Sequence, residues 1–596
     1  MFGQARKNLH ALAAEQPPFV PFPSRRSVVH STNGIVSCTQ PLAAQAGIKI
    51  LRDGGNAADA AVAVAAALNV TEPTSTGIGG DVFCLFYNAS TRTIRGINAS
   101  GRSPAALSLA RARKDLGLSG RKRYVNDLGD EVAQIPMGHV HAVTVPGAAA
   151  GWVDVVEKFG SGKVHMEQVF GEAVRLAEEG FPVSELSARF WAECEHTIRD
   201  ASPDNAGELL KGGKRPPRVG EIMKMPGLAR VFRKLAKEGK SAFYEGEVAR
   251  ALVEAVKKRG GVMEMDDLER HGKLGSEKTV PIGIEFSGTK VWECAPNGQG
   301  LVALMALGII EEMEKRGDIK PLGLGDKGYG HNEAEYLHAV IEALRIAFSD
   351  GHWWIADPSV SPVPVSGLLS SSYLASRAAL FSPSSTNSSI SHGTPAFQST
   401  DTVYFSVTDA HGNGCSFINS TFGGFGSGII PADCGFVLQN RGAGFSLLTD
   451  HPNVLEGGKR PYHTIIPGML TDPTGSELQA VFGVMGGFMQ PQGHVQVLLN
   501  GLRCNMSPQA ALDAPRISIG SNYDPGAPVV HVEEGISEET VRGLREKGHV
   551  VEVVKEYGRG MFGRGQVIVA GWDEEEGQRV WSAGSDPRGD GQAVGY

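Results

Sequence analysis

The sequence predicts a chain of mixed helices and strands around a substantial core, and three observations favour this class. Of 596 residues, 41% are hydrophobic and 20% are charged, which suits a packed interior and excludes disorder over the whole chain. Residues 331–350 place apolar side chains three and four positions apart, the spacing of an amphipathic helix. Residues 402–420 hold two β-rich runs around Gly412-Asn413, the pattern of a hairpin.

The other elements follow from apolar and turn patterns. Residues 41–73 predict two helices interrupted at Gly54-Gly55, and the second is apolar on all sides, so we expect it to be buried. Residues 207–221 are polar and broken by proline, which predicts a surface loop. Six of the ten residues 382–391 are serine, a composition that buries little apolar surface, so we expect an exposed linker at about residues 375–401.

Charge and composition narrow the class of partner. A net charge of −8 argues against nucleic acid or an anionic membrane. The longest apolar run, residues 60–68, is shorter than the ~20 residues of a membrane span, and the N-terminus lacks a secretory apolar stretch. The seven cysteines form no C-x-x-C, which favours a reducing compartment. We therefore expect a soluble cytoplasmic protein with a small-molecule substrate. The 17 histidines show no metal-ligand spacing, so no metal or cofactor is expected.

The junction between linker and hairpin is the strongest candidate for chemistry. The linker ends at Asp401, and Thr402 opens the first predicted strand. A threonine hydroxyl attacks an amide poorly unless a base takes its proton. If the peptide bond before Thr402 is cut, its own α-amino group, with a pKa near ~7.7–8.0, can be that base. The local pattern alone favours a plainer interpretation, in which Thr402 is a β-branched residue that begins a strand.

Several short motifs occur in order along the chain: Gly54-Gly-Asn-Ala-Ala-Asp-Ala-Ala, Gly77-Ile-Gly-Gly-Asp, Gly101-Arg-Ser-Pro-Ala, Val145-Pro-Gly-Ala, Asp401-Thr-Val-Tyr-Phe, Phe425-Gly-Ser-Gly, Lys459-Arg-Pro, Met485-Gly-Gly and Ser585-Asp-Pro-Arg-Gly-Asp-Gly. Together, from about residue 34 to residue 596, they resemble the gamma-glutamyltransferase family of N-terminal-nucleophile hydrolases. The resemblance implies a four-layer αββα sandwich. It also implies self-cleavage into a large subunit, residues 1–401, and a small catalytic subunit, residues 402–596, which form one composite domain. The partners would be these two subunits as a heterodimer, with a higher homo-oligomer left open.

The resemblance also implies roles at the reacting centre. Thr402 matches the family nucleophile, and the bond between Asp401 and Thr402 matches the processing site. Gly486 and Gly487 match a glycine pair whose N–H groups face the oxyanion, where the absence of Cβ lets the backbone approach the substrate. Ser420 matches a hydroxyl that bonds to the nucleophile. Simpler alternatives stay open, namely a turn for the glycine pair and a water-facing hairpin position for Ser420.

On the substrate side, the chain departs from the family's transpeptidases. Arg102 matches the arginine that binds the substrate carboxylate through a bidentate pair, although most single arginines are surface residues. The acid and the amide that hold the substrate's α-ammonium are replaced by Gly444 and Arg441. Two like charges ~4 Å apart repel by about 4 kcal/mol at an effective dielectric constant of ~20. A pair of serines is replaced by His463 and Thr464, where His463 fits a substrate contact and an ordinary buried histidine equally well.

These departures resemble the branch that includes oxamate amidohydrolases and acylases, and they leave three functions to separate. The first is an autoprocessed N-terminal-threonine amidohydrolase. Its pocket would hold cations, Arg102 with Arg441 as a second candidate, and no carboxylate to receive an ammonium. It would accept an acyl group with a carboxylate but no free α-amine, as in oxamate or a glutaryl amide. The second is a gamma-glutamyltransferase or glutathione hydrolase with the same machinery. The third is an unprocessed, non-enzymatic relative that binds carboxylates.

Overall fold

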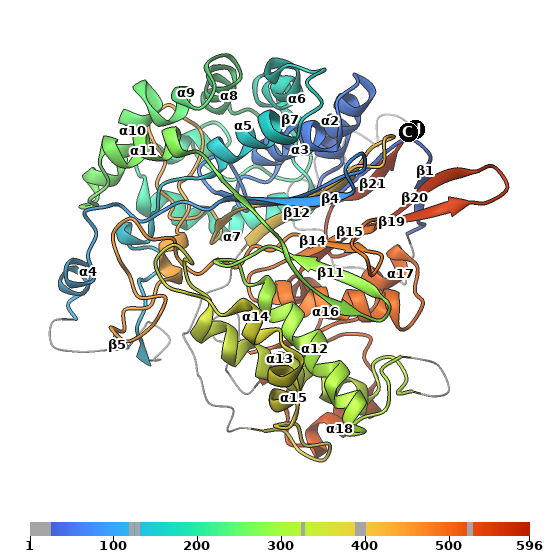
Figure 1. Ribbon diagram of the computed structural model, residues 1–596. Helices are drawn as coiled ribbons and strands as arrows, with labels where there is room; N and C mark the ends of the chain where they lie inside the picture. The colour runs from blue at the N-terminus through green and yellow to red at the C-terminus, as the bar shows by residue number, and fades with distance from the viewer. Residues whose placement is uncertain (1–25, 119–123, 126–130, 324–327, 388–400, 521–528) are drawn as a thin grey trace, which may run out of the picture.

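Two seven-stranded sheets lie face to face between two layers of helices (Figure 1). The computed structural model describes residues 26–118, 124–125, 131–323, 328–387, 401–520 and 529–596. Neighbouring strands in both large sheets are antiparallel. The predicted α+β class, with its αββα sandwich, is confirmed.

The strands come from all parts of the chain. In spatial order the first sheet contains β1 (Val29–Ser31), β20 (Gln578–Ser585), β19 (Arg564–Asp573), β15 (Leu478–Met485), β14 (Gly468–Thr471), β11 (Thr289–Glu293) and β10 (Ile282–Phe286). The second contains β21 (Gln592–Gly595), β2 (Ile35–Cys38), β12 (Asp401–Thr408), β13 (Gly414–Phe422), β3 (Asp81–Asn88), β4 (Thr93–Ala99) and β9 (Glu277–Thr279). Smaller sheets are formed by β16 (Ile517–Ile519), β17 (Val529–Glu533) and β18 (Val550–Val554), by β5 (Tyr124–Val125) and β6 (Glu131–Val132), and by β7 (Phe181–Pro182) and β8 (Ile222–Met223). Since β12 packs on β15, the hairpin that begins at the Asp401–Thr402 junction faces the strand that leads to the glycine pair.

Each sheet has its own helical cover (Figure 1). The second sheet is covered by α2 (Pro41–Arg52), α3 (Ala57–Thr71) and α5 (Ala148–Phe159), with α6 (Met166–Glu179) and α8 (Pro226–Glu238) outside them. The first sheet is covered by α12 (Gly300–Arg316), α16 (Met489–Leu502) and α17 (Pro508–Asp513), with α13 (Ala334–Trp354), α15 (Ser371–Ala378) and α18 (Glu538–Glu546) beyond. The other α-helices among the described residues are α4 (Leu109–Asp115), α7 (Glu185–Ala201), α9 (Ser241–Tyr244), α10 (Gly246–Lys258), α11 (Met265–Leu274) and α14 (Val365–Leu368).

The elements predicted from periodicity form as expected. Helices α2 and α3 are the pair predicted at residues 41–73, and all residues of α3 are buried. Helix α3 begins where the Asn56 side chain accepts hydrogen bonds from the N–H groups of Ala58 and Asp59, which satisfies two donors that have no partner within the helix. The pattern at residues 331–350 becomes α13, and the predicted hairpin becomes β12 and β13.

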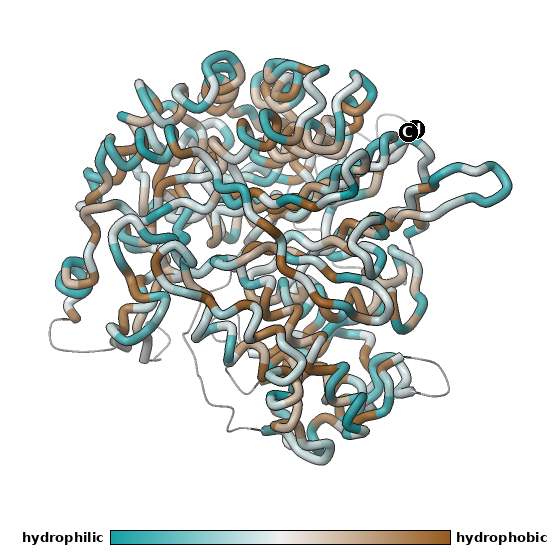
Figure 2. Tube along the Cα trace, viewed as in Figure 1, coloured by the Kyte–Doolittle hydropathy of each residue, from teal (hydrophilic) through white to brown (hydrophobic). Residues whose placement is uncertain are grey.

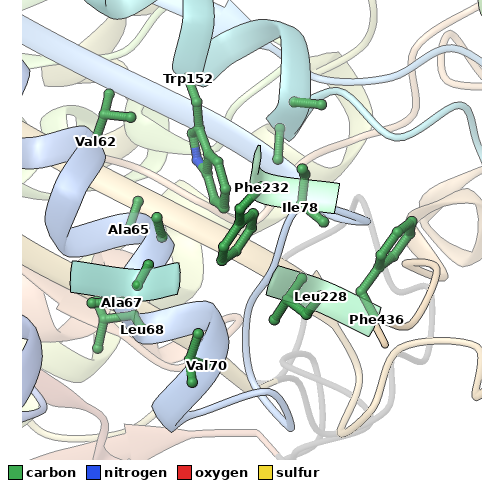
Figure 3. Close-up of a cluster of buried hydrophobic side chains, with 14 of the residues drawn as sticks. Val62, Ala65, Ala67, Leu68, Val70, Ile78, Trp152, Leu228, Phe232 and Phe436 are labelled. Carbon is green, nitrogen blue, oxygen red and sulfur yellow. The ribbon is translucent and has the colours of Figure 1, made fainter. Parts of the chain in front are cut away.

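A cluster of buried hydrophobic side chains, which includes the aromatic residues Trp152 and Phe232, supports the hairpin from the helical side (Figure 3). The ring centroids of Trp152 and Phe232 are 6.0 Å apart, and Trp152 Nε1 donates a hydrogen bond to Asn419 Oδ1 at 2.9 Å. Asn419 precedes Ser420 on β13, so this cluster fixes the strand that faces Thr402. Truncating a large aromatic residue in such a core typically costs about 3–5 kcal/mol of stability.

The predicted linker at about residues 375–401 needs a correction at its start. Helix α15 continues to Ala378. The carboxylate of Glu342, which is fully buried, accepts hydrogen bonds from Thr386 Oγ1 at 2.8 Å and from the Asn387 N–H at 3.0 Å. The composition argument considered only apolar burial, whereas this segment is held through its polar atoms. The rest of the predicted linker, residues 388–400, lies outside the described residues.

Hydropathy follows the layers (Figure 2). The inner strands and the helix faces against them carry most of the hydrophobic residues, while the projecting end of the β19–β20 hairpin is hydrophilic. Among the described residues, no helix combines the length and the apolar character that a bilayer crossing requires.

Candidate active site

Thr402 is the second residue of strand β12, which begins at Asp401. The pairing with β13 shifts here, because Asp401 pairs with Phe422 while Val403 pairs with Asn419. Thr402 therefore lies opposite two residues of β13, Ser420 and Thr421, so the extra residue of this bulge is on β13. Thr402 is fully buried, and its Oγ1 lies 3.0 Å from Ser420 Oγ. The predicted contact between the hydroxyl groups of Thr402 and Ser420 is thus present in the structure.

Ser420 connects Thr402 to a cation. Its Oγ accepts hydrogen bonds from the Phe422 N–H at 2.9 Å and from Arg441 Nη2 at 3.2 Å. A serine hydroxyl has two acceptor positions and one proton. With two N–H groups on its oxygen, Ser420 can donate its own proton to Thr402 Oγ1, which would leave the Thr402 proton available to a base.

Arg441 lies in a short 3-10 helix, residues Arg441–Gly444, and is 1% exposed. Its Nη1 donates to Thr464 Oγ1 at 2.7 Å, and its guanidinium carbon lies 3.9 Å from the centre of the Phe422 ring, a cation–π contact. Among the described residues, its guanidinium hydrogen bonds go to hydroxyl groups rather than to a carboxylate, and Nε has no hydrogen-bond partner. Burial lowers its pKa to about 9, against the opposing field of Asp81, so the side chain stays largely cationic at neutral pH.

His463 is buried and forms a pair with Asp81. Its Nε2 lies 3.1 Å from Asp81 Oδ2, while its Nδ1 accepts a hydrogen bond from the Ile465 N–H at 3.3 Å. These contacts assign the proton to Nε2 and make His463 a neutral donor. Burial and the charge of Arg441 hold the pKa of His463 well below its usual range.

Asp81 is a carboxylate beside this site that the sequence did not predict. It is fully buried and pairs with Ser420 across strands β3 and β13. Burial raises its pKa to about 6, although Arg441 and the N–H groups of Gly101 and Gly147 act in the opposite direction. Asp81 Oδ1 accepts both of these N–H groups, and Oδ2 faces His463. The carboxylate is therefore already hydrogen-bonded on both oxygens.

The glycine pair lies between strand β15 and helix α16. Gly486 and Gly487 have φ angles of +128° and +56°, which favour glycine over residues with a Cβ. Their carbonyl groups accept hydrogen bonds from the N–H groups of Met489 and Gln490, at 2.9 Å and 3.2 Å, and so begin the helix. Gln299 Nε2 joins the pair to the Arg441 region, since it donates to Gly487 O at 2.8 Å and to Thr464 O at 2.7 Å.

Arg102 is placed differently from the other predicted site residues. Its Nη1 donates to Asp357 Oδ2 at 2.8 Å and to Gly458 O at 3.1 Å. With Arg460 and His271 it lines a cavity of about 250 Å³. Among the described contacts, none joins its guanidinium to Thr402 or to the hydrogen-bonded set around it. Asp357 already occupies the position that a substrate carboxylate would take.

Two residues of this site were not found by sequence reasoning. Asp81 was visible within Gly77-Ile-Gly-Gly-Asp, a motif used for the resemblance, but nothing in the pattern marked its side chain as a site group. Gln299 precedes an apolar helix, and nothing in the sequence links it to Gly487 or Thr464.

One group with metal-ligand chemistry occurs among the described residues. His338, Glu342 and His549 place their ligand atoms within 4.8 Å of one another. His338 Nδ1 lies 2.8 Å from His549 Nε2, and Arg345 Nη1 lies 3.1 Å from Glu342 Oε1. The arginine already supplies the positive charge that a metal ion would bring, so this arrangement does not fit a cation site.

Comparisons with known proteins show which family this chain is similar to. The gamma-glutamyltranspeptidase family model matches residues 43–596. The glutathione hydrolase-like YwrD proenzyme of Bacillus subtilis (strain 168) is 33% identical over 579 residues, which cover 96% of this chain and 99% of that protein. The oxamate amidohydrolase proenzyme of Klebsiella pneumoniae subsp. pneumoniae is 30% identical over 571 residues, covering 95% and 99%. A crystal structure of cephalosporin acylase from Bacillus halodurans has a TM-score of 0.82 and 37% identity, covering 97% of this chain and 99% of that chain.

The fold and these similarities define an N-terminal-nucleophile enzyme, a hydrolase or transferase of amide bonds. Within that class, the chain belongs to the gamma-glutamyltranspeptidase family, as the resemblance in the sequence predicted.

Proposed function

We propose that this enzyme is an autoprocessed N-terminal-threonine amidohydrolase that cleaves amides whose acyl group carries a carboxylate and lacks a free α-amine. Oxamate and glutaryl amides are the two acyl types that fit. The observation that carries the proposal is Arg441, a buried cation one hydroxyl away from Thr402 whose guanidinium hydrogen bonds go to hydroxyl groups. Asp81 acts on this cation through its electrostatic field, and a substrate carboxylate would add a hydrogen-bonded counter-ion.

Processing would precede catalysis. The bond between Asp401 and Thr402 breaks to give subunits of residues 1–401 and 402–596, which stay together as a heterodimer. Two relatives of this chain carry the word proenzyme in their names, which supports this step. Cleavage gives Thr402 a free α-amino group beside its hydroxyl, the two groups that a one-residue nucleophile and base require.

In the reaction, Thr402 Oγ1 attacks the amide carbon while the α-amino group takes its proton. The N–H groups of Gly486 and Gly487 stabilise the oxyanion, and the leaving amine departs with the proton. Water then attacks the Thr402 ester by the same path in reverse and releases the acid. Ser420 supports the nucleophile through the 3.0 Å contact between the two hydroxyl oxygens.

The acyl group would be selected by charge. Arg441 binds the carboxylate, and His463 and Thr464 lie beside that position. Arg102 offers a second cation if a substrate carboxylate displaces Asp357. A γ-glutamyl group adds an α-ammonium that would meet Arg441, and both oxygens of Asp81 are already hydrogen-bonded. These contacts disfavour a γ-glutamyl donor.

Gamma-glutamyl chemistry is the second candidate, because the family model and the glutathione hydrolase-like relative both favour it. Assays of oxamate, a glutaryl anilide and a γ-glutamyl anilide on the same preparation separate the two. We expect the first two substrates to be hydrolysed with the higher kcat/KM. A preference for the γ-glutamyl anilide would reject the proposed specificity.

The nucleophile is tested with the Thr402→Ala variant. We expect an intact chain of 63.1 kDa and a rate lower by about 10⁶-fold, the loss typical of removing an enzyme nucleophile. Denaturing electrophoresis and N-terminal sequencing of the smaller wild-type band give the readout. A wild-type enzyme that hydrolyses these amides while residues 401 and 402 remain joined would refute the mechanism, and a chain that neither splits nor hydrolyses any of them would fit the third, non-enzymatic alternative.

A further inference from the structure

The side chain of Gln299 joins three segments that are distant in sequence. It is fully buried at the start of helix α12. Its Nε2 donates to Gly487 O at 2.8 Å and to Thr464 O at 2.7 Å, while its Oε1 accepts from Tyr462 Oη at 3.0 Å. Both protons of the amide and one acceptor position of its oxygen are therefore used, which fixes the orientation of the amide group.

The backbone around Gln299 strengthens this connection. The Gln299 N–H donates to His463 O at 3.0 Å, and the His463 N–H donates to Asn297 O at 2.9 Å. The amide thus extends from a backbone that is itself paired to the His463–Thr464 segment, so movement of Gly487 relative to that segment would stretch a hydrogen bond of Gln299.

We infer that Gln299 is a positioning residue that sets the distance between the oxyanion donors and the carboxylate anchor at Arg441. The inference rests on the proposed function. One nitrogen holds the carbonyl of Gly487 at one end and the carbonyl of Thr464, whose hydroxyl accepts from Arg441, at the other. A glycine pair has unusual backbone freedom, so it needs such an external support to keep its N–H groups aimed.

This arrangement predicts two kinetic effects. Small misplacement of an oxyanion donor lowers the rate of the chemical step, and a 1 Å shift can reduce it by about 10²-fold. If the distance between the oxyanion site and Arg441 is no longer fixed, the enzyme also discriminates less between acyl chains of different length. A residue that only stabilised the fold would change neither quantity in correctly folded enzyme.

The test uses Gln299→Met, which keeps the length of the side chain and removes its two donors. Gln496→Met is the matched control, since Gln496 is also buried, donates to Gln492 O at 2.9 Å and Ile517 O at 3.0 Å, and accepts from the Ile517 N–H at 2.8 Å. For processed Gln299→Met we expect kcat to fall about 10- to 100-fold with KM changed less than about 3-fold, and the ratio of kcat/KM for oxamate and glutaryl anilide to move towards one. Gln496→Met should keep the wild-type kcat and ratio.

Tyr462→Phe provides a second variant if Gln299→Met does not fold. It removes the donor to Gln299 Oε1, and we expect kcat to fall about 3- to 10-fold, the value of one neutral hydrogen bond. Equal kcat values for Gln299→Met and Gln496→Met would overturn the inference, as would an unchanged kcat in Tyr462→Phe. If the wild type prefers a γ-glutamyl anilide, the proposed specificity fails, while a kcat loss on that substrate in Gln299→Met but not in Gln496→Met still supports the inference.

Discussion

Two groups of buried arginines in this protein are neutralised in different ways. Near the end of the chain, Asp586 accepts hydrogen bonds from Arg516 Nη2 at 2.7 Å and from Arg588 Nη1 at 3.0 Å, and Glu533 accepts from Arg588 Nε at 2.7 Å. Burial opposes the charge of Arg588, but the two carboxylates outweigh it and raise the pKa of Arg588. This group is complete without a ligand.

Beside Thr402, the corresponding partners are hydroxyl groups. Arg441 donates to Thr464 and Ser420, and burial lowers its pKa. Asp81 acts on this cation through its electrostatic field, but among the described residues the guanidinium donates its hydrogen bonds to hydroxyl groups, so it keeps the capacity to bind an anion. The comparison teaches that a buried arginine is a candidate for anion binding when its hydrogen bonds go to hydroxyl groups rather than to a carboxylate.

The largest expected effect concerns the group near the end of the chain, in which Arg516 and Arg588 are paired with carboxylates. Asp586→Asn leaves Arg516 buried without its carboxylate, so we expect the free energy of unfolding to fall by about 3–5 kcal/mol. Urea denaturation measures this loss, and Glu574→Gln at the exposed tip of the β19–β20 hairpin should change nothing. If Asp586→Asn lost no more stability than the control, the claim that this group stabilises the fold would be wrong.

The free energy of unfolding should depend on pH with opposite sign through two carboxylates, Asp81, whose field acts on Arg441, and Asp586, which pairs with Arg516 and Arg588. The pKa of Asp81 is about 6 against an unfolded value of 3.8, so the folded state binds more protons in this range and loses stability as pH rises from 4 to 6. Relative to Asp81→Asn, the wild type should lose about 2 kcal/mol between pH 4 and pH 7, at 1.36 kcal/mol per pKa unit.

Asp586 gives the opposite sign. Burial opposes its charge, but Arg516, Arg588 and two N–H groups outweigh it and hold its pKa below 3.8. The stability it contributes is present above pH 4 and is lost as pH falls through its folded pKa. Denaturation curves of wild type, Asp81→Asn and Asp586→Asn across pH 3–7 check both signs, and parallel pH dependence in the three proteins would contradict this prediction.

Next in size is the effect of removing the cation beside Thr402. For Arg441→Met we expect KM for a carboxylate-bearing amide to rise about 10- to 100-fold, the value of a charged hydrogen bond of about 1.5–3 kcal/mol. The same amide with the carboxylate as a methyl ester should show no such change. Unfolding free energy should change little in Arg441→Met, whereas Arg516→Met, which removes one of the two arginines that pair with the buried Asp586, should be strongly destabilised. Equal destabilisation of both variants would mean that Arg441 is structural.

The smallest expected effect concerns the hydroxyl between Arg441 and Thr402. Ser420→Ala should lower kcat about 3- to 10-fold, the value of one neutral hydrogen bond of about 0.5–1.5 kcal/mol. Ser416 lies on the same strand, is buried, and has its Oγ 2.8 Å from Tyr404 Oη, so Ser416→Ala is the control and should keep the wild-type kcat. Identical kcat values in the two variants would exclude a special role for Ser420.

Features formed by residues that are close together in the sequence could be predicted, whereas contacts between distant residues could not. The capped helix α3, helix α13 and the β12–β13 hairpin were predictable because their patterns repeat over a few residues. The pairing of Thr402 with Ser420 was within reach for the same reason, since one hairpin carries both. The contact between His463 and Asp81 joins residues 382 positions apart, and no local pattern announces it.

Sequence reasoning missed partners that come from elsewhere in the chain. Arg102 was expected to bind a substrate carboxylate, and the structure adds an ion pair with Asp357 that no local pattern announces. Residues 382–387 were expected to be loosely held, but Glu342 binds Thr386 and Asn387 through its buried carboxylate. In both cases, the missing information was the side chain at the other end of the interaction.

By itself, the sequence determined the class of the fold, the family and the threonine that begins the hairpin, because these depend on the order and spacing of residue types along the chain. Only the tertiary structure decided which charges are compensated. A carboxylate and a guanidinium neutralise each other when folding brings them within about 3–4 Å, whatever their separation in sequence. That condition left Arg441 with hydroxyl partners beside Thr402 and gave Arg102, Arg516 and Arg588 carboxylate partners.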